Sequence, residues 1–331
     1  MRHFLTTEDW TKAEISALLE DARALKAAPQ NESLAGKRCA LIFFNPSLRT
    51  RTSFQVGIAD LGGTSVLLDA AGTWPIEVEP GAIMDGAAEE HVAEAAQVLS
   101  RYVDLIAIRS FPKFEDWERE REDPLLNGFV RHASVPIINM ETIIHPCQEL
   151  AMLMALEAEH GTLDGKKLCL TWTYHPKPLN TAVANSALLA ATKMGMDVTL
   201  LCPSEEYVLD DQFIKAGERF AADNGQSLTI THDIDSAYRG ADAVYAKSWG
   251  RLDQIGLPMD ARLTPDALRH FIVDEEKMAL TNNATFSHCL PMRRNIKATD
   301  AVVDGPRSLI IDEAENRLHV QKAVLRALIG S

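Results

Sequence analysis

The feature that most constrains the fold is a regular alternation of strand-like and helix-like segments that begins at Cys39. Short apolar runs are typical of buried strands, and the longer segments between them carry the spacing of amphipathic helices. Such alternation is typical of a parallel sheet whose strands are connected by crossover helices. The sequence therefore predicts an α/β fold with doubly wound parallel sheets.

The alternation continues through both halves of the 331-residue chain, which is long enough for two domains of about 150 residues each. In the first half we expect strands over 39–44, 65–68, 105–108 and 136–139, and helices over 53–61, 89–102 and 125–132. In the second half we expect strands over 167–171, 197–201, 227–231, 243–246, 271–273 and 285–288, and helices over 181–194, 211–224 and 235–238.

A long helical pattern over 146–159 separates the two halves and predicts a helix that connects their sheets. We therefore expect a first domain over residues 1–148 and a second domain over residues 149–314. A last amphipathic helix is expected from residue 315, and we expect residues 315–331 to pack back on the first domain.

Charge and cysteine usage limit the possible partners. The formal net charge of -14 would repel a phosphate backbone, so no nucleic-acid partner is expected. No uninterrupted apolar run reaches about 18 residues and residues 1–10 lack a signal-peptide core, so no membrane span is expected. Five widely separated cysteines without a Cys-x-x-Cys pair fit a reducing compartment, without disulfides or a metal site. We expect a cytoplasmic protein whose anionic ligands bind in a local basic pocket.

Basic and hydroxyl side chains follow the first expected strand, in the segment Phe-Phe-Asn-Pro-Ser-Leu-Arg-Thr-Arg-Thr at 43–52. Where a strand turns into a helix, free backbone N–H groups and the positive helix end favour an anion. The planar guanidinium group of arginine can donate two parallel hydrogen bonds to such an anion. The segment predicts a phosphate-binding loop, and the alternative is a surface turn with two solvated arginines.

Two further polar groups follow later strands. His145 and Gln148 lie three residues apart at the start of the connecting helix, where an imidazole could polarise a carbonyl oxygen and an amide could hold an N–H₂ group. Arg109 ends the expected strand 105–108. The alternatives are an ordinary polar helix start for the first pair and a lone surface arginine for the second.

A third cluster, at 287–297, gathers a thiol and several cations after another strand, and we expect all three clusters to line one cleft. The motifs Ser-Leu-Arg-Thr-Arg-Thr (47–52), His-Pro-Cys-Gln (145–148) and His-Cys-Leu-Pro (288–291), in this order, resemble the aspartate/ornithine carbamoyltransferases, which use carbamoyl phosphate. The resemblance covers nearly the whole chain, and the last motif is similar to the ornithine branch more than to the aspartate branch.

The chain departs from that branch where a Ser-Met-Gly loop contacts the α-amino group of ornithine, because residues 246–250 read Ala-Lys-Ser-Trp-Gly here. Segments 73–77, 171–180 and 295–300 instead resemble the members of the family whose acceptor is N-acetylornithine. The resemblance implies an enzyme of arginine biosynthesis that transfers the carbamoyl group of carbamoyl phosphate to the δ-amine of N-acetylornithine, without a cofactor or a metal.

The resemblance also implies the roles of single residues. Carbamoyl phosphate would be bound by Ser47, Leu48, Arg49, Thr50, Arg109, His145, Gln148, the Leu290 carbonyl and Arg317, with Trp74 from a neighbouring subunit. Four of these, Arg49, Thr50, Arg109 and His145, would be catalytic. N-acetylornithine would be bound by Glu89, Glu141, Asn180, Lys247, Cys289, Leu290 and Lys297. Lys297 would be carboxylated, which requires an amine whose pKa is lowered by burial or by nearby cations.

Glu89 matches the position that distinguishes acetyl from succinyl substrates in this family, where the succinyl type has proline. A carboxylate beside the acyl group would repel the extra carboxylate of a succinyl group, so Glu89 indicates the acetyl substrate. The alternative is that Glu89 is one of two acids that begin the helix expected over 89–102.

Two architectural features are implied by the resemblance alone: a homotrimer with sites at subunit interfaces, and a trefoil knot in the second domain around the loop 174–180. The remaining alternatives are an N-succinylornithine or an ornithine carbamoyltransferase, and a non-catalytic protein that binds carbamoyl phosphate or an amino acid.

Overall fold

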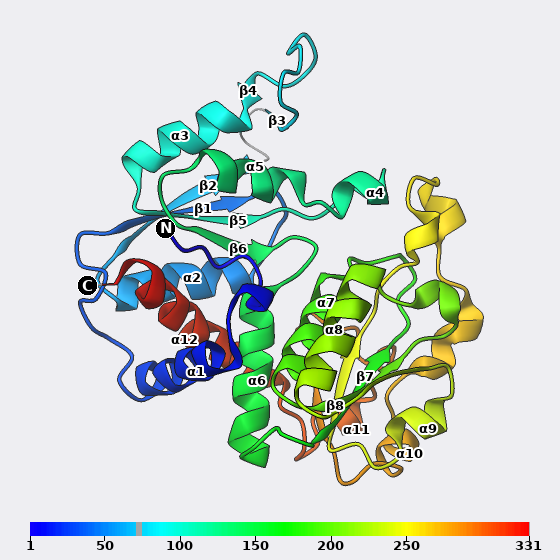
Figure 1. Ribbon diagram of the computed structural model, residues 1–331. Helices are drawn as coiled ribbons and strands as arrows, with labels where there is room; N and C mark the ends of the chain where they lie inside the picture. Colours follow the sequence, from blue (N-terminus) through cyan, green and yellow to red (C-terminus); the bar gives the residue numbers. More distant parts are fainter. Residues whose placement is uncertain (71–74, 331) are drawn as a thin grey trace. The chain divides into compact units, whose positions relative to one another are not determined.

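The structure is a computed structural model that describes residues 1–70 and 75–330 (Figure 1). The chain divides into two compact units, Met1–Cys147 with Arg317–Ser331, and Gln148–Asn316. The chain passes from one unit to the other inside two helices, α6 (Pro146–His160) and α12 (Ile310–Ile329). Each unit contains one main parallel sheet, which confirms the prediction of an α/β fold with two parallel-sheet domains.

The sheet of the first unit has the strand order β2-β1-β5-β6, and all neighbouring strands are parallel. Its strands are β1 (Arg38–Phe43), β2 (Thr64–Asp69), β5 (Leu105–Arg109) and β6 (Ile137–Glu141). From β1 the chain continues to β2 on one side of β1, and it then returns to form β5 on the other side of β1. The carboxyl ends of β1 and β5 therefore border a topological switch point, where open α/β sheets bind ligands.

Helices cover both faces of this sheet (Figure 1). On one face, α3 (Val92–Tyr102) and α5 (Pro124–His132) bury a continuous apolar cluster against β1, β5 and β6. On the other face lie α1 (Lys12–Ala27), α2 (Arg49–Asp60) and α12. Gly57 lets α2 and α12 approach closely, because a Cβ atom there would lie 3.1 Å from Lys322 Cγ.

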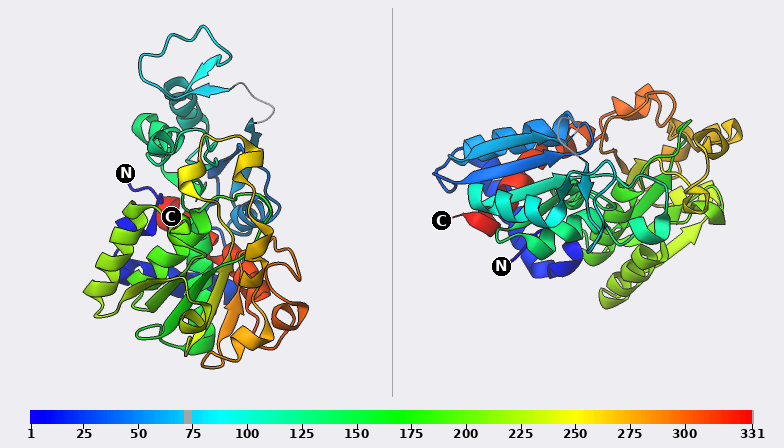
Figure 2. Two further views of the ribbon diagram at one scale, coloured as in Figure 1. Left: turned by 90° about the vertical axis from the view of Figure 1, so that its right-hand side faces the viewer. Right: turned by 90° about the horizontal axis from the view of Figure 1, so that it is seen from above.

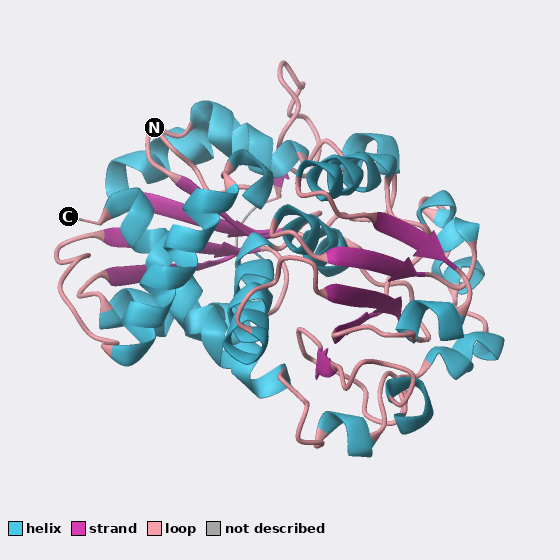
Figure 3. Cartoon of the chain, turned by 60° about the horizontal axis from the view of Figure 1, so that its bottom comes forward, coloured by secondary structure: helices cyan, strands magenta, loops and turns pink. Residues whose placement is uncertain are grey.

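The sheet of the second unit has the order β11-β10-β7-β8-β9 and is also parallel throughout. Its strands are β7 (Lys167–Trp172), β8 (Asp197–Leu201), β9 (Leu228–Thr231), β10 (Ala243–Lys247) and β11 (Thr285–Ser287). Its further helices are α7 (Ala182–Lys193), α8 (Asp211–Asp223), α9 (Ile234–Tyr238), α10 (Glu275–Met278) and α11 (Asp300–Val303). Figure 3 shows helices on both sides of the strands in each unit. The switch point of this sheet lies between β7 and β10.

Short elements complete the chain. The first unit also contains α4 (Trp117–Glu120), a 3₁₀ turn at Thr7–Asp9, and the two-stranded parallel pair β3 (Ile76–Glu77) and β4 (Glu90–His91). The segment between β3 and β4 extends away from the rest of the first unit in two views (Figures 1 and 2). The second unit contains 3₁₀ turns at Glu205–Tyr207, Leu252–Gln254, Met259–Arg262 and Asp266–Phe271. Among the described residues, the helices are too short or too polar to span a bilayer.

The structure corrects several predicted boundaries. The helix expected at 53–61 begins at Arg49, and the helix expected at 89–102 begins at Val92, where the His91 side chain accepts a hydrogen bond from Ala93 N. The last helix begins at Ile310, five residues before the predicted start. The strand expected at 271–273 is wrong, because a 3₁₀ helix continues to Phe271 and Val273 forms only one isolated bridge, to Ala298.

Replacement of Gly217 by alanine is expected to destabilise the protein by about 1–3 kcal/mol, because overpacking of a filled core shifts side chains or backbone. Gly217 lies where α8 crosses α7, and a Cβ atom there would lie 2.3 Å from Leu188 Cδ2. Leu188 is completely buried, so its side chain has little room to move. Chemical denaturation measures the free energy of unfolding. Gly86→Ala is the control, since a Cβ atom at Gly86 meets nothing within 4 Å; an equal loss in both variants would contradict the explanation.

Candidate active site

The first group of predicted site residues lies at the switch point of the first unit. Two hydrogen bonds tie the ends of β1 and β5 together: Phe44 N donates to Arg109 O at 2.9 Å, and Phe111 N donates to Asn45 Oδ1 at 2.6 Å. The end of β1 leads directly into the first turn of α2. The first turn of α2 and the Arg109 side chain therefore lie at the same edge of the sheet.

The first turn of α2 carries several groups that can donate hydrogen bonds to an anion. Thr50 N donates to Ser47 Oγ at 3.1 Å, which holds the turn although the N-cap residue Leu48 has no capping side chain. Arg317, from α12, donates from Nη2 to Thr50 Oγ1 at 2.6 Å, and both residues are buried. Arg49 is half-buried at the first helical position. A helix N-terminus, two guanidinium groups and two hydroxyls are thus brought together from two distant segments.

Glu141 lies between two predicted site residues at the end of β6. Its carboxylate accepts a short hydrogen bond from Arg109 Nη1, and its Oε2 lies 3.3 Å from His145 Nε2. All three side chains are buried. Arg109 also lies with its guanidinium carbon 4.5 Å from the centre of the Phe111 ring. The sequence assigned Glu141 to the acceptor, and the structure places it in the first unit, beside the residues assigned to carbamoyl phosphate.

The switch point of the second unit brings the segments after β7 and β10 together. Thr173 N donates to Lys247 O, and Gly250 N donates to Leu179 O, both at 2.9 Å. Gly250 is needed for this approach, because a Cβ atom there would lie 2.4 Å from Pro178 Cβ and 3.1 Å from its Cα. The replaced loop at 246–250 therefore packs on the proline-rich loop that the sequence singled out.

Lys297 is the basic site residue of the second unit whose pKa differs most from its usual value. It is 2 % exposed, and burial, followed by the neighbouring charge of Lys247, lowers its pKa to about 7. Its Nζ lies 3.4 Å from Nε2 of the fully buried His288. Leu290 N donates to His288 Nδ1 at 2.9 Å, so Nδ1 is an acceptor and Nε2 carries the proton.

The other acceptor-side residues lie at loop positions of the second unit. Cys289 is buried, and Leu290 has a left-handed backbone with φ of 54°, which a branched side chain rarely adopts. Asn180 Oδ1 accepts from Ala182 N at 3.1 Å and so fixes the start of α7. Gln148, which the sequence assigned to carbamoyl phosphate, also belongs to the second unit, but it lies in the helix α6, where its Nε2 donates to the buried carboxylate of Glu313.

The predicted residues thus divide between the two units. The first unit holds Ser47, Leu48, Arg49, Thr50, Glu89, Arg109, Glu141, His145 and Arg317, and the second holds Gln148, Asn180, Lys247, Cys289, Leu290 and Lys297. Trp74 lies outside the described residues. Glu89 is exposed in the segment before β4 and is not in the first turn of α3, which begins at Val92. The single cleft expected from the sequence stays a prediction.

Two residues that the sequence analysis did not assign, His288 and Glu313, contact predicted site residues directly. His288 begins the His-Cys-Leu-Pro motif and could have been identified there. Glu313 belongs to the acidic run Asp-Glu-Ala-Glu at 312–315, which has the same pattern as a solvated helix start.

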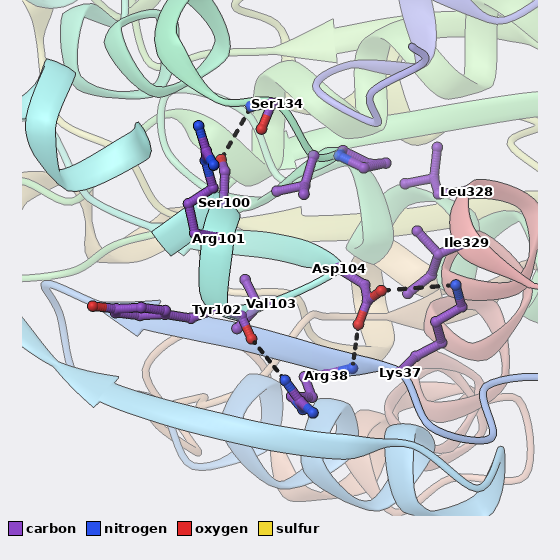
Figure 4. Close-up of a pocket in the computed structure, with 12 residues that line it drawn as sticks. Lys37, Arg38, Ser100, Arg101, Tyr102, Val103, Asp104, Ser134, Leu328 and Ile329 are labelled. Atoms are coloured by element: carbon purple, nitrogen blue, oxygen red, sulfur yellow. Dashed lines mark hydrogen bonds and ion pairs between the residues drawn. The ribbon is translucent and has the colours of Figure 1, made fainter. Parts of the chain in front are cut away.

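A separate hollow of about 530 Å³ lies at the opposite edge of the first sheet, beside Arg38 and Asp104 (Figure 4). Asp104 there accepts from Arg38 N at 2.9 Å and lies 3.7 Å from Lys37 Nζ. Because β1 begins at Arg38 and β5 begins at Leu105, this hollow lies at the amino ends of the strands, away from the predicted site residues.

Comparison with known proteins gives one consistent match. Residues 2–158 match the aspartate/ornithine carbamoyltransferase carbamoyl-P binding domain, and residues 166–328 match the Asp/Orn binding domain of the same family. N-acetylornithine carbamoyltransferase from Xanthomonas campestris pv. campestris is 59% identical, over 100% of this chain and 98% of the relative. N-succinylornithine carbamoyltransferase from Bacteroides fragilis is 37% identical, over 88% of this chain and 87% of the relative.

The fold comparison agrees. A crystal structure of acetylornithine transcarbamylase complexed with acetylcitrulline matches with a TM-score of 0.97 and 59% identity, and it covers 100% of both chains.

Proposed function

This chain belongs to the aspartate/ornithine carbamoyltransferase family, and we propose that it transfers the carbamoyl group of carbamoyl phosphate to the δ-amine of N-acetylornithine. The products are N-acetylcitrulline and phosphate, and the reaction would serve arginine biosynthesis. The observation that carries the proposal is the first turn of α2, where the buried Arg317 donates a hydrogen bond to Thr50. The 59% identity to a relative named for the acetyl acceptor, against 37% for one named for the succinyl acceptor, favours the acetyl substrate.

The chemistry follows from the groups in the first unit. The neutral δ-amine attacks the carbamoyl carbon and forms the new N–C bond, so negative charge develops first on the carbonyl oxygen. The bond between the carbamoyl carbon and the phosphate oxygen then breaks, and the phosphate leaves with the proton that the amine loses. Arg109, Thr50 and His145 are proposed to stabilise the carbonyl oxygen, and Arg49 with the N-terminus of α2 the phosphate. The reaction needs no covalent bond to the enzyme, since alignment of two reactants can supply on the order of 7 kcal/mol.

Glu141 contacts two of the three side chains that are proposed to stabilise the carbonyl oxygen. Its carboxylate now accepts from Arg109 and lies next to His145. A guanidinium has five N–H donors, so Arg109 can keep this ion pair and still donate to a substrate. We propose that Glu141 orients both side chains, in addition to the contact with the acceptor implied by the family resemblance.

On the acceptor side, Lys297 is proposed to be carboxylated. Only a neutral amine can attack carbon dioxide, and a pKa of about 7 leaves a large neutral fraction at neutral pH. The Nε2–H of His288 is directed at Lys297 Nζ, and it can donate to a neutral amine or to the carboxylate formed there. Lys247, whose charge contributes to the lowered pKa, would in turn stabilise the new negative charge. Together with Cys289, Asn180 and the Leu290 carbonyl, these groups are proposed to bind N-acetylornithine.

The proposed reaction is tested by measuring ureido product colorimetrically with carbamoyl phosphate and each of ornithine, N-acetylornithine and N-succinylornithine. We expect turnover with N-acetylornithine to exceed turnover with either alternative. Product from none of the three would indicate a non-catalytic binding protein, and a preference for another acceptor would replace the proposed substrate.

Glu89→Pro is expected to shift selectivity from N-acetylornithine toward N-succinylornithine, because it removes a carboxylate that would repel the succinyl group. Since Glu89 is exposed before β4, the change should leave α3 and the core intact. The ratio of kcat/KM for the two acceptors measures the effect. Glu90→Gln, at the next position, is the control, and an unchanged ratio in Glu89→Pro would refute the assignment.

The finer architectural expectations belong to the same proposal. We propose a cytoplasmic homotrimer in which Trp74 of one subunit reaches the site of another, and a trefoil knot in the second unit around the loop 174–180. All five cysteines are described and buried, and none of them forms a disulfide, which fits a reducing compartment. Light scattering at several protein concentrations tests the trimer.

A further inference from the structure

Glu313 is a fully buried carboxylate of the second unit, and it lies in the first turn of α12. Donors from three other elements converge on it: the Gln148 amide from α6, the Tyr245 hydroxyl from β10 and the Ser287 hydroxyl from β11. The Tyr245 oxygen lies 2.8 Å from Glu313 Oε1. A buried carboxylate is unfavourable unless donors surround it, so this arrangement distinguishes Glu313 from the exposed acids beside it.

The network determines which way the Gln148 amide faces. A glutamine side chain ends in one N–H₂ donor and one acceptor oxygen, whereas a carboxylate that receives three donors offers only acceptors. The amide must therefore turn its nitrogen toward Glu313, because the reverse orientation would bring two acceptor oxygens together. The opposite atom, Gln148 Oε1, is then directed away from Glu313.

Gln148 Oε1 is a buried acceptor that can receive a hydrogen bond from a ligand. Gln148 is 1 % exposed, and its Oε1 has no hydrogen-bond partner within the part of the chain that the structure describes. A buried acceptor without a donor is unfavourable, so a ligand that supplies an N–H group gains affinity from this atom. The carbamoyl group of carbamoyl phosphate ends in such an N–H₂ group.

We propose that Glu313 is a positioning residue, which fixes the amide orientation of Gln148 so that Oε1 accepts from the carbamoyl N–H₂ group. The inference rests on the proposed function and adds a residue that acts through Gln148 without contacting the substrate. Glutamine at position 313 has nearly the same shape as glutamate. Its own N–H₂ group can donate to Gln148 Oε1, so Gln148 can turn over and lose the orientation that the substrate needs.

A double-mutant cycle in the full-length enzyme tests the proposal. With saturating N-acetylornithine, Glu313→Gln is expected to lower kcat/KM for carbamoyl phosphate by about tenfold or more, mainly through KM. The KM for N-acetylornithine should change by less than about twofold, whereas general damage to the unit would raise both constants. Glu315→Gln, an exposed acid two residues further along the same helix, is the matched control.

The decisive comparison is made in a Gln148→Ala background. If Glu313 acts through Gln148, Glu313→Gln has no further effect on kcat/KM there, within about threefold. If the loss in kcat/KM of the double variant equals the product of the losses of the two single variants, the proposal is overturned. If Glu313→Gln fails to fold, Glu313→Asp enters the same cycle with the same expectation, because it keeps the charge and withdraws the acceptor. A wild-type enzyme that forms no ureido product overturns the proposed function and this inference together, whereas an active enzyme with multiplied losses overturns only the inference.

Discussion

Arg49→Ala is expected to lower kcat/KM for carbamoyl phosphate by about a thousandfold or more, because it removes a guanidinium from the proposed phosphate site. Arg49 occupies the first position of α2, beside the hydrogen-bonded pair Thr50 and Arg317. In the proposed reaction, negative charge moves onto the phosphate as its bond to the carbamoyl carbon breaks. A donor that strengthens as this charge develops contributes to the rate as well as to binding, so kcat should fall together with kcat/KM.

The fold should survive the change, because Arg49 is half-buried and the turn is held by Ser47 and Thr50. Arg51→Ala is the matched control, since Arg51 lies in the same turn of α2 and its side chain is exposed. Ureido-product formation gives the rate, and circular dichroism with thermal unfolding reports the fold. A wild-type rate in Arg49→Ala at saturating carbamoyl phosphate would exclude the proposed contact of Arg49 with the phosphate. Equal losses of rate in Arg49→Ala and Arg51→Ala would indicate a general effect of net charge.

The strands of both sheets could be predicted because parallel sheets covered on both faces require continuous apolar runs. In β5 every residue is buried, and in β1 only the first is exposed. Such runs differ clearly from the amphipathic pattern of the helices between them. The order of the strands could not be read in this way, and it is the order that places the two switch points.

The start of α2 was predicted four residues late for a physical reason. Its N-cap, Leu48, carries no capping side chain, so the usual signal of a helix start is missing. Arg49, Thr50 and Arg51 resemble a polar loop in the sequence, whereas in the structure they form the first turn of the helix. The mistaken boundary therefore falls at the proposed phosphate site, where arginine and threonine replace the usual residues of a helix start.

Glu313 illustrates a different limit of the sequence. The acids at 312, 313 and 315 are alike in the sequence, and only burial separates the one at 313 from its exposed neighbours. Its partners Gln148, Tyr245 and Ser287 come from positions between 26 and 165 residues away. A network made by such distant residues becomes visible only once the strands and helices are placed.

Lys297→Arg is expected to abolish most of the turnover, with a loss of about a hundredfold or more, although the positive charge is retained. Arginine stays protonated at all working pH values and cannot form a carbamate with carbon dioxide. A site that needs a cation at position 297 would tolerate the change, whereas a site that needs a carboxylate there would not. Lys215→Arg, at an exposed position of α8, is the control.

The wild-type enzyme provides an independent test through pH. Because burial lowers the Lys297 pKa to about 7, the amine is mostly protonated at pH 6 and mostly neutral at pH 8. Activity in carbon-dioxide-depleted buffer should therefore recover on addition of bicarbonate, faster at pH 8 than at pH 6, and it should not recover in Lys297→Arg.

The free energy of unfolding reports the pKa of Lys297 without a measurement of turnover. Between about pH 7 and pH 10.5 the unfolded chain holds a proton on Lys297 that the folded chain has released. The free energy of unfolding of the unmodified enzyme should therefore rise with pH across this window. In Lys297→Met this contribution is absent, so the variant should be more stable than the unmodified wild type at pH 7, and the difference should shrink as the pH approaches 10.5. A difference that stays constant with pH would show that Lys297 keeps an ordinary pKa, and the proposed carboxylation would then lose its chemical basis.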